Sequence, residues 1–543
     1  MSTQEKPRRV LVIGWDGATF NVADPLLKAG RLPNLARLIE RGARCRLRST
    51  IPPNSSIAWS SFMTGKQAGK HGVYYFVERT PGSYARRFIN STSLRTETLW
   101  SILSRHDKRI GVVNVPVTYP PRPINGTMVA GMLSPNPESN FTWPPELHSE
   151  LMAQVGPVPM DHVEGGVSYA PDRLGILSEI WKDQETRARM GRYLMRRDDW
   201  QFFMLVFTSS DRIGHVSMRF KDERFAKDSP ELVAKFGSIL EHTYMQLDRL
   251  TGDLLDEIDD DTTVLLLSDH GMGPLKKRFR LARWLIENGY LVLKPDAESR
   301  RKAWHIRKRR ITSRISITAP ARYPLPPWEL VDWSRTRAYP SWGGGEEVVL
   351  INQRGREPQG IVRPGEDTSR LCDEICERLL KILDPDTGRP FIPAAFKRED
   401  LWHGEAVDLG PDIQFEVEDV AYHVDCGLFD GEVLHEPYDK VPGMHRMDGI
   451  LVASGPGVQP GVEVDRNQLI DVAPSVCHLL DVPVPEDMDG RVMENLFTDE
   501  FKEANPVVLG PPTPPVDGIE KQDYGEDEAA AVAETLRSMG YVT

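Results

Sequence analysis

Short apolar runs alternate with longer amphipathic segments along the first half of the chain. Continuous apolar runs at 10–13, 202–207 and 264–267 are typical of strands that are buried on both faces. Between these runs, apolar residues recur every three or four positions, as in 177–197 and 231–258, which is the spacing of an amphipathic helix. Strands that alternate with helices predict an α/β fold with a mainly parallel central sheet.

Two segments interrupt this alternation. Residues from about 118 to 172 are rich in Pro and Gly and weakly periodic, which indicates an insertion within a first part of the core at 1–295. A strongly basic stretch then suggests an insertion or lid at 296–345, for which a solvated surface helix is the alternative. We expect a second part of the core at 346–500, followed by a linker and a terminal helix at 501–543.

The composition narrows the class of protein. The 543-residue chain carries a formal net charge of −12, which argues against general nucleic-acid binding. An acidic protein that handles an anionic substrate needs local cations or metal ions. The five cysteines show no dense spacing, and the apolar run near the start is too short for a secretion signal or a membrane span. We therefore expect a cytoplasmic protein without a membrane partner.

The segment TIPPNSSIAWSSFMTG, residues 50–65, has the signals of a helix start and stop. The prolines keep the approach extended, Asn54 or Ser55 can cap the first free N–H groups, and Gly65 is a suitable terminator. A serine hydroxyl is thus expected at the positive end of a helix, where anions bind. A serine that only caps the helix is the alternative.

Several metal-type ligands border the predicted strands. They are Asp16, Asp211, His215, Asp269, His270 and His445. All but His445 follow a strand, and loops at the carboxyl ends of parallel strands converge on one crevice. Six such ligands with the Ser55 hydroxyl suit two divalent metal ions about 4 Å apart and phosphoryl-transfer chemistry. We expect zinc, with manganese and iron as alternatives. Taken one at a time, each of these residues could instead have an ordinary role in a turn or loop.

The motifs GWDG, AWSSFMTG, SSDRIGH, SDHGMG and GMHRMDG follow one another along the chain. In this order they resemble the alkaline phosphatase superfamily and, within it, the type I phosphodiesterase/nucleotide pyrophosphatase branch, especially its predicted phosphohydrolase/phosphomutase group. The resemblance runs over nearly the whole chain. It implies an alkaline-phosphatase-like α/β/α sandwich with a mainly parallel central sheet and an inserted cap or lid.

The resemblance also implies a role for each candidate. One metal ion would be held by Asp211, His215 and His445. The second would be held by Asp16, Asp269 and His270, and it would also bind the nucleophile Ser55. The nucleophile lies ten residues before the Gly of the TG pair in this branch, which points to Ser55, with Ser56 as the alternative.

At one position the sequence differs from the pattern of this branch, and the difference weakens the expectation of a nucleotide substrate. Nucleotide pyrophosphatases carry an Asn three residues after the nucleophile, and this position is Ala58 here. A phosphate oxygen would then be bound by the helix N-terminus or by Asn54. We expect a hydrolase of small phosphate mono- or diesters that works through a phosphoseryl intermediate, with its oligomeric state left open. A phosphomutase or phosphotransferase, or a metal-stabilised binding protein without activity, are the alternatives.

Overall fold

The computed structural model describes residues 8–160, 177–296, 327–342, 347–417, 422–426, 428, 432–435, 443–516 and 521–539. Residues 297–326 and 343–345 of the predicted basic insertion and the end of the Pro/Gly-rich segment therefore lie outside the described residues. Among the described residues, no helix combines the length and the apolar character that crossing a membrane requires.

A ten-stranded sheet forms the centre of the molecule, in the order β20-β2-β19-β9-β1-β8-β5-β6-β7, with β21 paired to β2. Its strands are β1 (Arg9–Trp15), β2 (Gly42–Arg48), β5 (Ile110–Val113), β6 (Gly126–Val129), β7 (Thr142–Trp143), β8 (Phe202–Phe207), β9 (Thr262–Leu267), β19 (Asp448–Ser454), β20 (Val462–Glu463) and β21 (Asn467–Gln468). The run β9-β1-β8-β5-β6 is parallel throughout, whereas β19 and β7 pair antiparallel to their neighbours. The expected mainly parallel sheet is confirmed.

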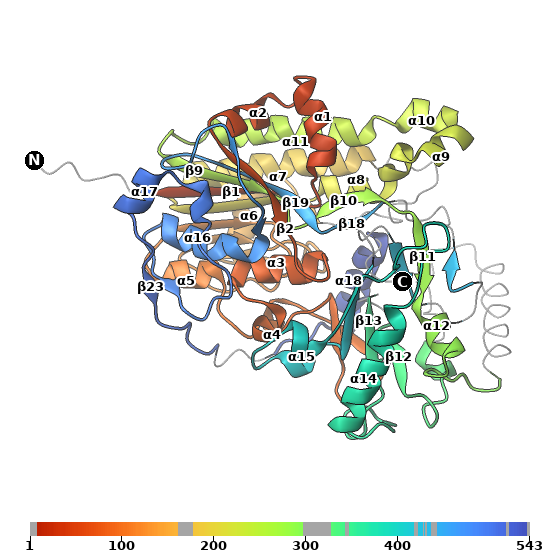
Figure 1. Cartoon of the computed structure of the whole chain (residues 1–543). Helices are drawn as coiled ribbons and strands as arrows, with labels where there is room; N and C mark the ends of the chain where they lie inside the picture. The colour runs from red at the N-terminus through yellow and green to blue at the C-terminus, as the bar shows by residue number, and fades with distance from the viewer. Residues whose placement is uncertain are drawn as a thin grey trace, which may run out of the picture.

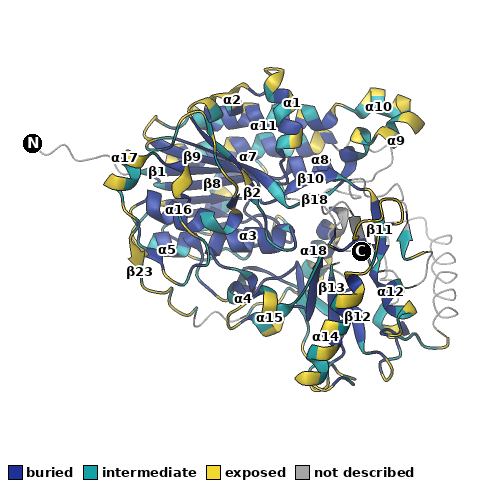
Figure 2. Ribbon diagram, in the orientation of Figure 1, coloured by how far each residue is buried: buried dark blue, intermediate teal, exposed yellow. Residues whose placement is uncertain are grey.

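Helices cover both faces of this sheet (Figure 1). Successive residues of a strand point to opposite faces, so Val10 and Val12 of β1 join one apolar cluster while Leu11 and Ile13 join the other. The first cluster includes α3 (Ser55–Thr64), α5 (Leu99–Arg105) and α16 (Val472–Leu479). The second includes α1 (Phe20–Lys28), α2 (Pro33–Glu40), α7 (Leu177–Arg197), α8 (Ser209–Ser217) and α11 (Ile239–Leu255). The strands are buried between the two helical layers (Figure 2), as expected for an α/β/α sandwich.

The helix expected at 231–258 is divided in two. Helix α10 (Pro230–Phe236) ends before Gly237, and α11 begins only at Ile239. The terminal helix is α18 (Glu526–Ser538), whose Val532 and Leu536 pack into the first apolar cluster.

A smaller unit with its own core lies beside the sandwich. Its four-stranded sheet has the order β12-β13-β15-β14, formed by β12 (Ala338–Pro340), β13 (Val348–Ile351), β14 (Ala394–Lys397) and β15 (Ile413–Glu416). Helices α12 (Leu281–Glu287) and α14 (Glu366–Leu379) contribute to the same apolar cluster. Residues 348–416, which we expected in the second part of the core, thus build a separate sheet, and the chain returns to the central sheet only with β19.

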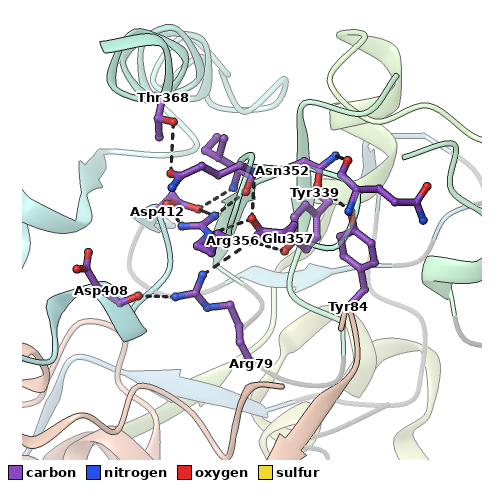
Figure 3. A network of polar contacts seen from close by, with 12 residues as sticks. Arg79, Tyr84, Tyr339, Asn352, Arg356, Glu357, Thr368, Asp408 and Asp412 are labelled. Carbon is purple, nitrogen blue, oxygen red and sulfur yellow. Dashed lines mark hydrogen bonds and ion pairs between the residues drawn. The ribbon is translucent and has the colours of Figure 1, made fainter. Parts of the chain in front are cut away.

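A network of charged and polar side chains lies where this unit meets a hairpin formed by β3 (Val77–Arg79) and β4 (Arg86–Phe88) (Figure 3). Arg356 donates two hydrogen bonds of 2.6 Å to the carboxylate of Asp412, which is buried. Arg79 donates to the carbonyl of Asp408 and lies 3.8 Å from Glu357, which Arg356 also contacts. Arg79 therefore links the hairpin to residues 357 and 408, whereas the pair of Arg356 and Asp412 lies within the smaller unit.

Candidate active site

The candidate nucleophile lies at the first position of α3. Asn54 caps the helix, because its Oδ1 accepts hydrogen bonds from the backbone N–H of Ser56 (3.1 Å) and from the Ser56 hydroxyl (2.7 Å). Gly65 ends the helix with a φ of 66°, a conformation that favours glycine. Ser55 is completely buried, and its Oγ lies 3.1 Å from Nε2 of His270. Of the two neighbouring serines, Ser55 therefore faces the candidate ligands, while the Ser56 hydroxyl takes part in the cap.

Three adjacent parallel strands bring the acidic residues to one edge. Trp15 at the end of β1 is level with Phe207 of β8, and Gly14 is level with Leu267 of β9. Asp16, the start of α8 and Ser268 come directly after these strand ends, so the side chains that follow share the carboxyl edge of the sheet. This register accounts for the meeting of ligands that are far apart in the sequence.

The last histidine comes from a two-stranded ribbon. β10 (Gly271–Pro274) continues from the segment that carries His270, and β18 (Gly443–Arg446) pairs antiparallel with it. The register places Met272 opposite His445. The ribbon thereby brings His445 against His270, with ring centroids 3.7 Å apart.

All seven predicted side chains lie close together at this edge of the sheet, where all are buried; we call this cluster the pocket. The side chains form two groups of three, and within each group the ligand atoms lie within 4.8 Å of one another. The first group is Asp211, His270 and His445, and the second is Asp16, Asp269 and His270. Oδ1 of Asp211 is 3.3 Å from Nε2 of His215 and 3.4 Å from Nε2 of His445. Nε2 of His270 is 3.4 Å from Oδ2 of Asp269 and 3.8 Å from Oδ1 of Asp16. His270 thus lies between the two sets of ligands.

The orientation of the three histidines fits a metal centre. Nδ1 of each ring faces a backbone carbonyl, that of Gly443 for His215 (2.9 Å), of Gly271 for His270 (3.0 Å) and of Pro53 for His445 (2.7 Å). In a neutral imidazole the nitrogen next to a carbonyl carries the proton, so each Nε2 keeps its lone pair. Those of His215 and His445 are only 3.1 Å apart. Lone pairs at this distance repel one another unless a cation binds them.

Two carboxylate oxygens provide an independent test. Oδ1 of Asp16 and Oδ2 of Asp269 are buried and accept no hydrogen bond from the residues that the structure describes. Leaving a buried acceptor without a partner costs about 1–3 kcal/mol, and more for a charged group. A divalent cation in the pocket would be the missing partner of both oxygens, so the residues fit a metal centre.

The electrostatics of the pocket agree with this interpretation. Burial, followed by the charges of Asp269 and Asp211, raises the pKa of Asp16 well above its usual range. Burial and the charge of Asp211 raise the pKa of Asp269 to about 7. For Asp211 burial acts in the same direction, and only the positive charge of protonated His215 and His445 outweighs it and lowers the pKa well below the usual range. With neutral imidazoles this compensation is missing. The aspartates therefore do not all ionise easily without a cation.

The fold is alkaline-phosphatase-like, with a mainly parallel central sheet between two layers of helices. The family model described as type I phosphodiesterase / nucleotide pyrophosphatase matches residues 10–329, more than half of the chain, and the chain belongs to this family. The resemblance inferred from the motifs is thereby confirmed, and the protein is an enzyme that acts on phosphoric ester bonds.

Solved structures share the fold at low sequence identity. An inactive variant of murine ectonucleotide pyrophosphatase/phosphodiesterase 5, in complex with AMP, is 15% identical with a TM-score of 0.51, covering 90% of this chain and 100% of that chain. Phosphonoacetate hydrolase from Sinorhizobium meliloti, in complex with phosphonoformate, is 15% identical with a TM-score of 0.54, and the match covers 88% of this chain and 96% of the hydrolase. A mutant of the alkaline phosphatase PafA is 13% identical with a TM-score of 0.51, and the match covers 92% of this chain and 100% of PafA. No curated protein sequence matches the chain.

One residue at the site, Trp59, was not predicted from the sequence. The indole N–H of Trp59 donates a 3.0 Å hydrogen bond to Oδ2 of Asp16. Trp59 follows Ser55 by four positions and therefore lies on the same face of α3, one turn further on. That spacing was the available signal, but in the sequence Trp59 is one apolar residue among several in a buried helix.

Proposed function

We propose that the protein hydrolyses phosphate mono- or diesters of small molecules through a phosphoseryl intermediate on Ser55, with two divalent metal ions in the pocket. One ion would be held by Asp211, His215 and His445, and the other by Asp16, Asp269, His270 and Ser55. The observation that supports this most directly is the position of the buried Ser55 hydroxyl, 3.1 Å from a histidine that belongs to both groups of candidate ligands. Zinc is the first candidate metal because the donor set is made of carboxylates and imidazoles.

The protein groups have clear tasks in such a reaction. Ser55 Oγ attacks phosphorus as the P–O bond to one alcohol group of the ester breaks, so that this group leaves as an alcohol that carries the proton lost by the serine. A water molecule then attacks the phosphoserine, which restores the Ser55 hydroxyl and releases the phosphate or, from a diester, the phosphate monoester. When bound, the metal ions neutralise the charge of the phosphoryl oxygens and favour the ionised hydroxyl. Because Ser55 is the first residue of α3, a phosphate next to it faces the positive end of the helix dipole. Asn54 uses its Oδ1 in the cap, which leaves its amide nitrogen as the donor to a phosphate oxygen.

The compartment is a further part of the proposal. All five cysteines lie in the described residues, and no disulfide joins them. Burial raises the pKa of the Cys45 and Cys477 thiols, so they are poor nucleophiles. Thiols of this kind support the cytoplasm as the place of action.

Two matched serine variants test the proposal. The protein is stripped of metal, reloaded with Zn²⁺, Mn²⁺ or Fe²⁺, and assayed with aryl phosphate monoesters and diesters. Ser55→Ala should lower turnover by at least a factor of about 1,000 without reducing the metal content, since it removes the nucleophile. Ser56→Ala removes only a capping contact and should keep most of the activity. Intact-mass measurement of quenched wild-type enzyme should detect a phosphorylated serine that Ser55→Ala lacks.

The outcome separates the proposal from its alternatives. Full activity in Ser55→Ala would contradict the assignment of the nucleophile. Transfer of the phosphoryl group to an added alcohol in place of water would identify a phosphotransferase or a phosphomutase. Bound metal with no turnover of any ester would identify a binding protein without activity.

A further inference from the structure

The contact between Trp59 and Asp16 joins the nucleophile helix to a candidate metal ligand. Both side chains are buried, with exposed fractions of 0% for Trp59 and 1% for Asp16. The hydrogen bond from the indole Nε1 to Oδ2 is 3.0 Å long, which is an ordinary length for an N–H donor. Ser55 and Trp59 lie one turn apart on α3, so any movement of this helix changes the serine and the indole together.

The two oxygens of Asp16 have different surroundings. Oδ2 accepts the indole N–H, whereas Oδ1 points toward Nε2 of His270 at 3.8 Å and accepts no hydrogen bond within the described residues. The main chain of Asp16 is held separately, because its N–H donates to the carbonyl of Phe207 and its own carbonyl accepts from the hydroxyl of Ser210. The indole therefore decides how the carboxylate is rotated and which oxygen is left for a cation.

We propose that Trp59 is a positioning residue, whose N–H orients Asp16 for metal binding and keeps that ligand in register with Ser55. The inference rests on the proposed function. An indole suits this task because it donates a hydrogen bond without carrying a charge. A lysine or arginine in its place would repel the cation that Asp16 is proposed to bind.

Packing fixes the direction of the indole N–H. A Cβ atom at Gly14 would lie 3.1 Å from Cη2 of Trp59 and 2.9 Å from Cγ2 of Val206, so the ring sits directly against strand β1. Phe62 meets the indole edge to face, with centroids 5.4 Å apart and an interplanar angle of 76°. A side chain confined in this way loses little entropy when it forms the hydrogen bond.

The test compares Trp59→Phe with Trp100→Phe. The first variant removes the N–H and keeps an aromatic ring. Trp100 is buried in the same apolar cluster and its indole N–H donates no hydrogen bond within the described residues, so its variant controls for lost ring volume. Metal-free proteins are titrated with Zn²⁺ against a chromophoric chelator, and bound zinc is counted by mass spectrometry. No phosphate ester is present.

We expect Trp59→Phe to weaken the binding of one of two zinc ions by about 10–100-fold, the effect typical of removing a partner that orients a metal ligand. The other ion should keep its affinity, as should both ions in Trp100→Phe. Equal affinities in wild type and Trp59→Phe would overturn the inference while leaving the proposed function intact. A wild-type protein that binds no divalent metal ion would overturn both.

A second measurement does not depend on the folding of the variant. In the wild-type protein, the indole N–H signals are followed by NMR during hydrogen exchange and zinc titration. One strongly protected indole N–H should shift as the two zinc ions bind, because the carboxylate it contacts becomes a ligand of one of them. If no protected indole signal responds to zinc, the inference is wrong.

Discussion

Replacing Asp269 with Asn should stabilise the metal-free protein while it weakens metal binding. Burial and the charge of Asp211 raise the pKa of this carboxyl from its ordinary value of 3.8 to about 7. The folded state therefore holds a proton that the unfolded chain has already released. The stability that this proton provides is fully present below about pH 4 and is lost as the pH rises to 7.

The magnitude follows from the same pKa values. At roughly 1.4 kcal/mol per pH unit, a pKa raised from 3.8 to about 7 lowers the free energy of unfolding by about 4 kcal/mol above pH 7. Asn has the shape of Asp without its charge, and its Oδ1 can still accept the 3.2 Å hydrogen bond from the N–H of Gly17. Asp269→Asn should thus recover up to about 4 kcal/mol at pH 8 and almost nothing at pH 4.

Urea unfolding of the metal-free proteins between pH 4 and pH 8 measures this effect. Asp260→Asn is a suitable control because that side chain is 85% exposed, so its variant should stay within about 0.5 kcal/mol of wild type. Saturating Zn²⁺ should reverse the order of stability, since the wild-type carboxylate is a better ligand than the amide. An Asp269→Asn protein that is no more stable than wild type at pH 8 without metal would refute the reasoning.

Two further predictions concern stability away from the pocket. Asp412→Ala removes one of the two carboxylates that Arg356 contacts and also the acceptor of the Ile351 N–H, and should lower the free energy of unfolding by about 3–5 kcal/mol in chemical denaturation. The double replacement Asp412→Leu with Arg356→Met should cost clearly less, because neither charge of that pair is then left behind. An equal loss in both would argue against an ionic role. Burial, with a smaller effect of the Lys66 charge, lowers the pKa of His71 to about 3, so stability is lost as the pH falls below 6.5, by about 2 kcal/mol at pH 5. In His71→Gln the free energy of unfolding should fall less between pH 6.5 and pH 5. An unchanged dependence on pH in this range would exclude His71 as its cause.

Local patterns in the sequence were enough to predict the sandwich and to select candidate ligands that the structure brings together. The apolar runs at 10–13, 202–207 and 264–267 belong to three adjacent parallel strands, and each carries its acidic residue to the same edge. This worked because a run buried on both faces shows its nature in its own composition, and because parallel strands end at one edge whatever their order. The short motifs added the family, which the family model confirms.

Which strands form the smaller unit was harder to predict from the sequence. Strand β13 (VVLI) is as apolar as the central strands, and β15 (IQFE) alternates apolar and polar residues as β2 of the central sheet does, so neither sequence indicates which sheet the strand joins. Their place depends on α12 and α14, which cover a second apolar cluster of their own. A local pattern predicts a strand, but its neighbours in the sheet are decided by contacts that the pattern does not contain.

The sequence by itself determined the alternation of strands and helices, the helix that starts at Ser55 and the supply of carboxylates and imidazoles. Only the tertiary structure decided how these groups face one another. The carbonyl of Pro53 orients His445 across 392 positions of the chain, and Trp59 orients Asp16 across 43. Such contacts depend on how packed elements meet in space, whereas periodicity and motifs describe only what each element can bury or bind.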